Sequence, residues 1–274
     1  MPMQVQVLSN HSGQQLDRTI GQLREAETAA AAWRNEHGRA WNDLEESRRT
    51  KPWWRHKLGL TTVAEQEASA RTQLAWHGVL TADQNRQLID TRARQLSAGM
   101  SGEQALADGL AVLDDSWTML RGYRNRRGET DHLLVGPTGV WAIEVKRRRI
   151  RLHVIGEQWW YEKLTAQGRC TEVAAAVDAG GRTWGRQVTD VAADLATWLA
   201  HNGHSLPVRT AVMIMHEQAR LGRCESPDVN VVGTRVVHLL WAIERSATVL
   251  TAPQRQEIVA LIRRDHSFHS ERRG

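Results

Sequence analysis

Residues 128–146 read GETDHLLVGPTGVWAIEVK and hold the pattern that decides the fold. Two short apolar runs, 131–135 and 140–145, are joined by Gly-Pro-Thr-Gly, which is strong turn chemistry, so the stretch predicts two antiparallel strands. Because side chains alternate along a strand, Glu144 and Lys146 are expected on the same face. Charges at the buried end of a sheet are costly unless they are paired or bind a metal. The stretch is therefore a candidate site.

Length and composition fit a soluble protein with one large domain, or with one domain and an appendage. The net charge of +5 suits a polyanionic partner without requiring one. Cys170 and Cys224 have neither metal-ligand spacing nor a disulfide framework. Together with the lack of a signal-peptide pattern, they favour the reducing cytoplasm. No apolar run approaches the roughly 20 residues that span a bilayer, so no membrane span is expected.

Residues 1–97 predict an all-α helical hairpin that precedes the rest of the chain. Proline-free sequence rich in Ala, Glu, Arg and Gln favours a helix over 14–49, and a second helical segment covers 62–96 with a break near Gly78. The thin apolar stripe is typical of a long hairpin or weak coiled coil, which makes homo-oligomerisation a candidate role. The basic turn 51–57 is interpreted as a tryptophan corner that packs one helix on the next, with contact to lipid headgroups or nucleic acid as the alternative.

Residues 98–250 predict an α/β domain with a mixed central β-sheet flanked by helices. The order from residue 101 is a helix capped by Ser101, three or four strands, a helix, two strands and two helices. Residues 208–215 are almost continuously apolar, as in a strand buried on both faces. Residues 251–274 predict a final helix and a basic tail.

Asp131, Glu144 and Lys146 are the residue types needed to hydrolyse a phosphodiester. Two carboxylates on adjacent strands can hold Mg²⁺, which prefers oxygen ligands, and the ion can polarise the phosphate and activate a water. Lys146 can stabilise the charge that develops on the phosphate. Glu103, on the apolar stripe of the preceding helix, can add a third carboxylate. The alternative is that Glu103 only complements the helix dipole.

Two arginine clusters, residues 124–127 and 147–151, flank the predicted hairpin at the same end of its strands. Arginine contacts to phosphates add affinity but read no sequence. A solvated charged face is the alternative for the second cluster. The residues expected to contact nucleic acid are Arg126, Arg127, Arg147, Arg148 and Arg149.

The stretch 128–146 resembles the signature of the nuclease-related domain (NERD) family, which is assigned to the PD-(D/E)xK superfamily of metal-dependent nucleases. The matching parts are the Asp131-His132 pair, the hairpin that follows it and the Glu144-Val145-Lys146 end of the second strand. The resemblance implies a restriction-endonuclease-like fold over about 98–235, with Asp131 and Glu144 as metal ligands and Lys146 as the catalytic lysine.

The same resemblance implies two further site residues. The acid of the superfamily's first helix falls on Glu103, and a glutamine early in the helix after the sheet falls on Gln187, near the site or the nucleic acid. Thr130 stands where an apolar residue is usual, and Arg147 where a small polar one is common. Neither departure removes a catalytic group.

The sequence therefore predicts a Mg²⁺-dependent endonuclease or a related DNA-processing enzyme, with Mn²⁺ able to replace Mg²⁺ and DNA a more suitable substrate than RNA. Alternatives are a catalytically silent nucleic-acid-binding module, because nuclease folds are reused for binding, and an assembly protein that uses residues 1–97. A purely structural ion pair between Lys146 and a carboxylate is a further alternative. His132 faces away from Asp131 and is interpreted as a packed residue, not a ligand.

Overall fold

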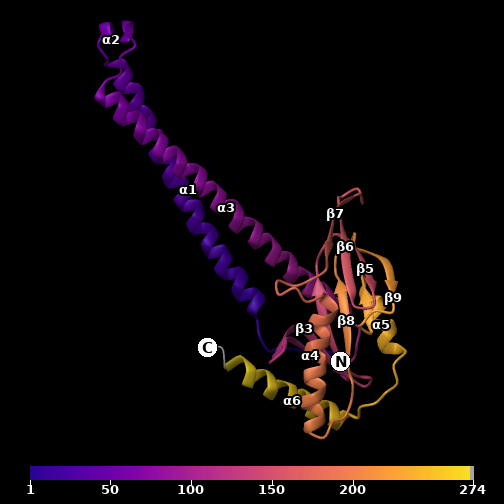
Figure 1. The fold of residues 1–274 in the computed structure, drawn as a ribbon. Coiled ribbons are helices and arrows are strands. Elements are labelled where there is room, and N and C mark those ends of the chain that lie inside the picture. Colours follow the sequence, from indigo (N-terminus) through magenta and orange to yellow (C-terminus); the bar gives the residue numbers. More distant parts are fainter. Residues whose placement is uncertain (272–274) are drawn as a thin grey trace. The chain divides into compact units, whose positions relative to one another are not determined.

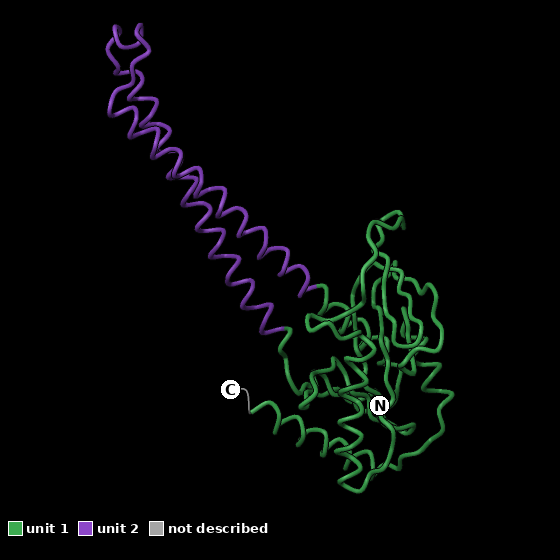
Figure 2. Tube along the Cα trace, in the orientation of Figure 1, with its two compact units in different colours: residues 1–12, 98–274 green, residues 13–97 purple. Residues whose placement is uncertain are grey.

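The computed structural model describes residues 1–271 and divides into two compact units. One unit comprises Met1–Ser12 and Ala98–Gly274, and the other comprises Gly13–Ser97 (Figure 2). The first twelve residues, which were predicted as part of the N-terminal helical region, therefore belong to the unit that holds the predicted α/β domain. The predicted basic tail includes residues 272–274, which lie outside the described part of the chain.

The unit Gly13–Ser97 is an antiparallel pair of long helices, α1 (His11–Arg49) and α3 (Val63–Leu110) (Figure 1). The start of α1 and the end of α3 belong to the other unit. The Thr72 hydroxyl donates to the carbonyl of Ala40 at 3.0 Å, and Lys51 Nζ lies 2.9 Å from Glu65 Oε2. Small side chains are buried between the helices and let them approach closely: Ala26, Ala30, Ala40, Ala68 and Ala75. The predicted pair of N-terminal helices is present.

The helix α3 is continuous, so the predicted break near Gly78 is wrong. A Cβ atom on Gly78 would lie 2.4 Å from ring atoms of Trp33. The glycine therefore allows a close approach between the two helices and does not end one. The predicted start of a new helix at Ser101 is wrong for the same reason, because α3 runs through that residue to Leu110.

The short helix α2 (Trp53–Lys57) connects α1 to α3 and buries none of its residues. Trp53 and Trp54 are 76% and 45% exposed, so the interpretation of this turn as a packed tryptophan corner is wrong. The Arg55 guanidinium lies 5.1 Å from the Trp54 ring centroid.

The other unit contains two mixed sheets where the sequence predicted one. The larger has the order β1-β2-β3-β4-β8-β10 and consists of β1 (Gln4–Val7), β2 (Thr118–Asn125), β3 (Gly128–Gly136), β4 (Gly139–Lys146), β8 (Val208–Ile214) and β10 (Val231–Gly233). The smaller has the order β7-β6-β5-β9 and consists of β5 (Ile150–Ile155), β6 (Gln158–Leu164), β7 (Cys170–Ala175) and β9 (Arg220–Glu225).

Helices cover both faces of the larger sheet. The helices α4 (Trp184–His201) and α6 (Ala252–Glu271) pack on one face, and α5 (Val236–Glu244) packs with the end of α3 on the other. Strand β4 is buried on both faces because Val140 and Ala142 contact the α4 side while Trp141, Ile143 and Val145 contact the α3 and α5 side. Side-chain alternation along β4 then directs Glu144 toward α4.

The chain described is a mixed α/β fold with a long N-terminal helical region. Within residues 1–271, no helix combines the length and the apolar content that crossing a bilayer requires.

Candidate functional site

The predicted hairpin at residues 128–146 is confirmed as strands β3 and β4. The two strands pair antiparallel, with His132 opposite Ile143 and Val135 opposite Val140. This register sets Asp131 beside the carboxyl end of β4, where its Oδ2 accepts the backbone N–H of Val145 at 2.6 Å. The turn chemistry thus brings one carboxylate from each strand to the same end of the hairpin.

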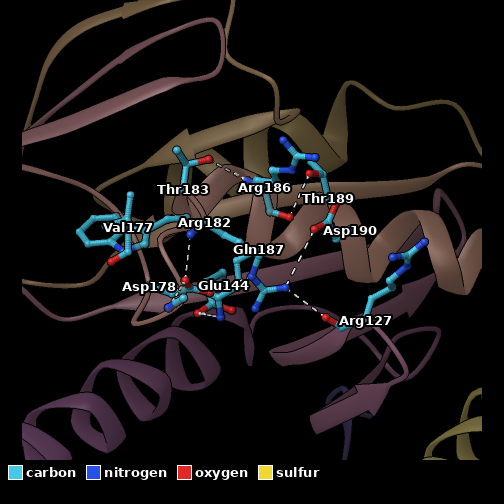
Figure 3. Close-up of polar contacts among 12 residues, drawn as sticks. Arg127, Glu144, Val177, Asp178, Arg182, Thr183, Arg186, Gln187, Thr189 and Asp190 are labelled. Carbon is cyan, nitrogen blue, oxygen red and sulfur yellow. Dashed lines mark hydrogen bonds and ion pairs between the residues drawn. The ribbon is translucent and has the colours of Figure 1, made fainter.

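Glu144 is the centre of the polar contacts at this end of the sheet. Its side chain is almost fully buried, and its Oε1 accepts from Lys146 Nζ at 2.5 Å and from Gln187 Nε2 at 2.9 Å. Gln187 lies in the first turn of α4 and points at Glu144 (Figure 3). Glu144 Oε2 is buried and has no hydrogen-bond partner. One oxygen of the carboxylate is therefore fully engaged and the other is available to a ligand.

The charges at the site perturb one another. Burial, followed by the charge of Glu144, raises the pKa of Asp131 well above its usual value. Burial alone would lower the pKa of Lys146, but the carboxylates of Glu144 and Asp131 more than offset it, so that pKa is raised. Lys146 consequently stays an ammonium, while two buried carboxylates repel each other. A cation between them would relieve that repulsion.

Glu103 is not part of this hydrogen-bonded group. Its Oε2 lies 3.7 Å from Arg121 Nη2, and the Ser12 hydroxyl donates to its Oε1 at 3.5 Å. Burial is the main cause that raises the pKa of Glu103, and Arg121 opposes it. In the described part of the chain, no three His, Cys, Asp or Glu side chains are grouped closely enough to hold a metal ion. The structure thus gathers Asp131, Glu144, Lys146 and Gln187, and leaves Glu103 on Arg121.

His132 lies on the opposite face of β3 from Asp131, as expected. It is fully buried, and this burial, with a smaller effect from Arg121, lowers its pKa to about 3. The side chain is therefore a neutral, packed imidazole.

Comparison with known families agrees with this geometry. Residues 98–215 match the family model described as the nuclease-related domain. This part of the chain is a nuclease-related domain. The matched range contains Asp131, Glu144, Lys146 and Gln187, and it confirms the family indicated by the sequence signature. Searches of curated proteins and of solved structures gave no significant match. The family indicates a nuclease-related function and interaction with nucleic acid.

The nuclease-related domain has a basic cavity on the α4 side of the hairpin. Its volume is about 490 Å³, and its lining includes Arg126, Arg127, Arg182 and Gln187. Arg126 pairs with Asp194 at 2.5 Å. Arg182 Nη1 donates to the carbonyl of Arg127 at 3.1 Å (Figure 3). The arginines of the first predicted cluster therefore line the same cavity as Gln187, which donates to Glu144.

The arginines that begin the second predicted cluster, residues 147–151, lie on different surfaces of the nuclease-related domain. The Arg148 guanidinium lies 5.4 Å from the ring centroid of Trp184 and 5.7 Å from that of Tyr161, and these two rings are stacked. Arg149 is exposed in the connection from β4 to β5. Arg147 lies on the other face, because a Cβ on Gly102 of α3 would approach the Arg147 Cβ to 2.9 Å.

Sequence reasoning missed two residues at this site. Trp184 is nearly fully buried, and Lys146 Nζ lies 5.9 Å from its ring centroid. It precedes Gln187 by three residues, which sets both on one helix face, so helical spacing could have revealed it. Tyr161, on β6 of the smaller sheet, gave no comparable signal because its contact with the site depends on how the two sheets pack.

Proposed function

We propose that this protein is a metal-dependent nuclease that hydrolyses phosphodiester bonds at Asp131, Glu144 and Lys146, with DNA a more suitable substrate than RNA. The observation that carries the proposal is that the two oxygens of the Glu144 carboxylate have different surroundings. Its Oε1 is held by Lys146 and Gln187, while its buried Oε2 has no partner. The mixed sheet with helices on both faces supports a restriction-endonuclease-like class for this unit.

The residues present fit a divalent cation. Asp131 and Glu144 offer hard oxygen ligands, and the buried, unpartnered Glu144 Oε2 requires a positively charged or donating neighbour. Mg²⁺ is the expected ion and Mn²⁺ is able to replace it. When bound, such an ion polarises the phosphate and lowers the pKa of a water molecule. Glu103 would join these ligands only by leaving Arg121.

The remaining residues orient the reacting groups. Lys146 keeps its proton because the carboxylates raise its pKa, so its ammonium can stabilise the negative charge that grows on the phosphate. Gln187 holds the Glu144 carboxylate in one rotamer through its amide N–H. Arg126, Arg127, Arg148 and Arg149 are positioned to contact backbone phosphates, which supports binding without base recognition.

A cleavage panel tests the proposal. Linear and circular DNA and RNA are incubated with the full chain in Mg²⁺, in Mn²⁺ and in EDTA. We expect cleavage only with metal, and a loss of about 100-fold or more in Glu144→Gln and in Lys146→Met. Glu157→Gln, in the turn between β5 and β6, and Lys163→Met, on β6, remove the same charges at exposed positions and should cut like the original protein. Full activity of Lys146→Met would overturn the assignment.

A catalytically silent nucleic-acid-binding domain is the second candidate. The observation in its favour is the 2.5 Å contact between Lys146 and Glu144, which gives the buried carboxylate a cationic partner without a metal. This candidate requires salt-dependent binding that Glu144→Gln leaves unchanged, and no cleavage with either ion.

A further inference from the structure

A second cavity, of about 750 Å³, lies at the carboxyl ends of three parallel strands. The strands β4, β8 and β10 are neighbours that run in the same direction. The residues that follow them line the cavity: Arg147 after β4, His216 after β8 and Arg235 after β10. In open α/β sheets, this is the edge at which ligands commonly bind.

This cavity lies on the opposite face of the sheet from Glu144 and Lys146. Its wall includes Ala105 of α3 and Val236 of α5, the two helices that cover that face. Lys146, by contrast, contacts Gln187 and Trp184 of α4. The cavity is therefore separate from the basic cavity that contains Gln187.

Three guanidinium groups line this second cavity, from Arg147, Arg220 and Arg235. Within residues 1–271, none of the three forms an ion pair with a carboxylate, and Glu217 is the one acidic residue of the lining. The arginines of the first cavity differ, because Arg126 and Arg182 are paired with Asp194 and Asp178. Three guanidinium groups beside a single carboxylate leave the second cavity with an excess of positive charge, so it attracts an anion.

We propose that this cavity is a second phosphate-binding subsite, which receives a nucleotide of the nucleic-acid strand away from the bond that is cleaved. The inference rests on the proposed function. Guanidinium groups bind phosphate in bidentate fashion, and three unpaired ones at a single cavity suit that group best. The volume falls in the range of about 300–1,000 Å³ that is usual for small-molecule sites, so it accommodates a nucleotide unit, more than an inorganic ion needs.

The arrangement also defines a path for the strand. Lys146 and Arg147 are consecutive, yet they serve opposite faces of the sheet. A strand that reaches both must cross the end of β4, with one phosphate near Lys146 and another among Arg147, Arg220 and Arg235. Helix α5 begins at Val236, which lines this cavity, and its first turn carries no acidic residue to compete for an anion.

The test measures binding without metal, so that it does not depend on catalysis. A fluorescein-labelled DNA oligonucleotide is titrated with the full chain in EDTA, between about 50 and 200 mM salt. The variant Arg220→Gln/Arg235→Gln changes two exposed side chains. We expect it to weaken binding about tenfold and to reduce the salt slope by about one. Arg245→Gln, the same change at the far end of α5, should alter affinity less than about twofold.

A loss of binding free energy in the double variant no more than twice that in Arg245→Gln would overturn the subsite, because the double variant removes two charges and such a loss would report only the net charge. Inorganic phosphate and a nucleoside monophosphate form two further arms. Arginine-dependent binding of either one that DNA fails to displace would assign the cavity to a free anion and overturn the nucleic-acid assignment. If the protein cleaves nothing but the double variant still loses DNA affinity, the subsite stands and the nuclease proposal fails. If Glu144→Gln abolishes cleavage while the double variant binds normally, only the subsite fails.

Discussion

Gln187 donates from Nε2 to Glu144 Oε1 at 2.9 Å, and the same carboxylate oxygen accepts the Lys146 ammonium. Gln187 Oε1 in turn lies 3.5 Å from Lys146 Nζ. The amide therefore bridges the Glu144 carboxylate and the Lys146 ammonium from a separate helix. Its role is to fix orientation, because it carries no charge and has no proton to transfer at neutral pH.

Replacement of Gln187 should separate orientation from charge. We expect Gln187→Ala to lower the metal-dependent cleavage rate about 10- to 100-fold, because second-layer hydrogen bonds to ligands have effects of that size. Gln187→Glu should be at least as damaging, since it adds a carboxylate beside Glu144 and removes the N–H donor. The cleavage rate at saturating Mg²⁺ measures both. Thr189→Ala, two residues further along α4, is the control. A cleavage rate of Gln187→Ala equal to that of the control would refute the bridging role.

Asp131 should make the metal-free protein less stable as the pH rises. Its folded pKa is raised, first by burial and then by Glu144, so the folded state keeps a proton that the unfolded chain releases above about 3.9. Stability therefore declines from the unfolded pKa up through the folded one. Asp131→Asn should raise the melting temperature in EDTA at pH 8, by roughly 2–4 °C for each kcal/mol recovered, and remove the Mg²⁺-induced increase.

Thermal unfolding from pH 5 to 9, with and without Mg²⁺, measures this effect. Asp17→Asn, at an exposed position of α1, is the matched control and should not change the profile. The prediction would be contradicted if the stability of the metal-free protein rose from pH 5 to 9 and followed the same profile as that of the Asp131→Asn variant.

His132 should make the protein sensitive to acid. Its pKa is lowered to about 3 in the fold, against about 6.5 in an unfolded chain, because burial disfavours the imidazolium. The unfolded state thus binds more protons, and stability is lost as the pH falls from about 6.5 toward 3. His132→Leu, of similar volume, should shift the midpoint of acid unfolding to lower pH. Circular dichroism against pH measures it, and an unchanged midpoint would count against the effect.

Gly78 should not tolerate a methyl group. An alanine Cβ would lie 2.4 Å from the Trp33 ring, so Gly78→Ala is expected to destabilise the α1–α3 hairpin by about 1–3 kcal/mol. Gly38→Ala, with nothing near its Cβ, should stabilise by up to about 1 kcal/mol through helix propensity. Adding Trp33→Ala to Gly78→Ala should recover part of the loss in a double-mutant cycle. Stabilisation by Gly78→Ala in chemical denaturation would refute the close contact.

The parts of the fold that follow from local pattern were predictable. Apolar runs and turn residues indicated β3 and β4, and helical spacing indicated α4 with its buried Val188, Val191 and Leu195. Strands β7 and β9 were missed because most of their residues are exposed and show no apolar alternation. Gly78 misled for a related reason, since its requirement comes from a tryptophan on the other helix.

The residues of the candidate site were likewise predictable only where a local pattern placed them. Alternation along β4 was enough to set Glu144 and Lys146 on one face, where they now make contact. Gln187 came only from family resemblance, because its place beside Glu144 depends on how α4 docks on the sheet. The pairing of Glu103 with Arg121 depends on two elements and could not be read from either one alone.

The parallel pairing of β1 with β2 has a consequence for how the helices can be removed. Gln4 pairs with Thr118, so the strand that precedes α1 and the strand that follows α3 are neighbours in one sheet. In topological terms the hairpin Gly13–Ser97 is an insertion between these strands and not a leading domain. Truncation at residue 97 would remove an edge strand as well. Only an internal excision, with a short linker from Ser12 to Ala98, separates loss of the hairpin from damage to the sheet.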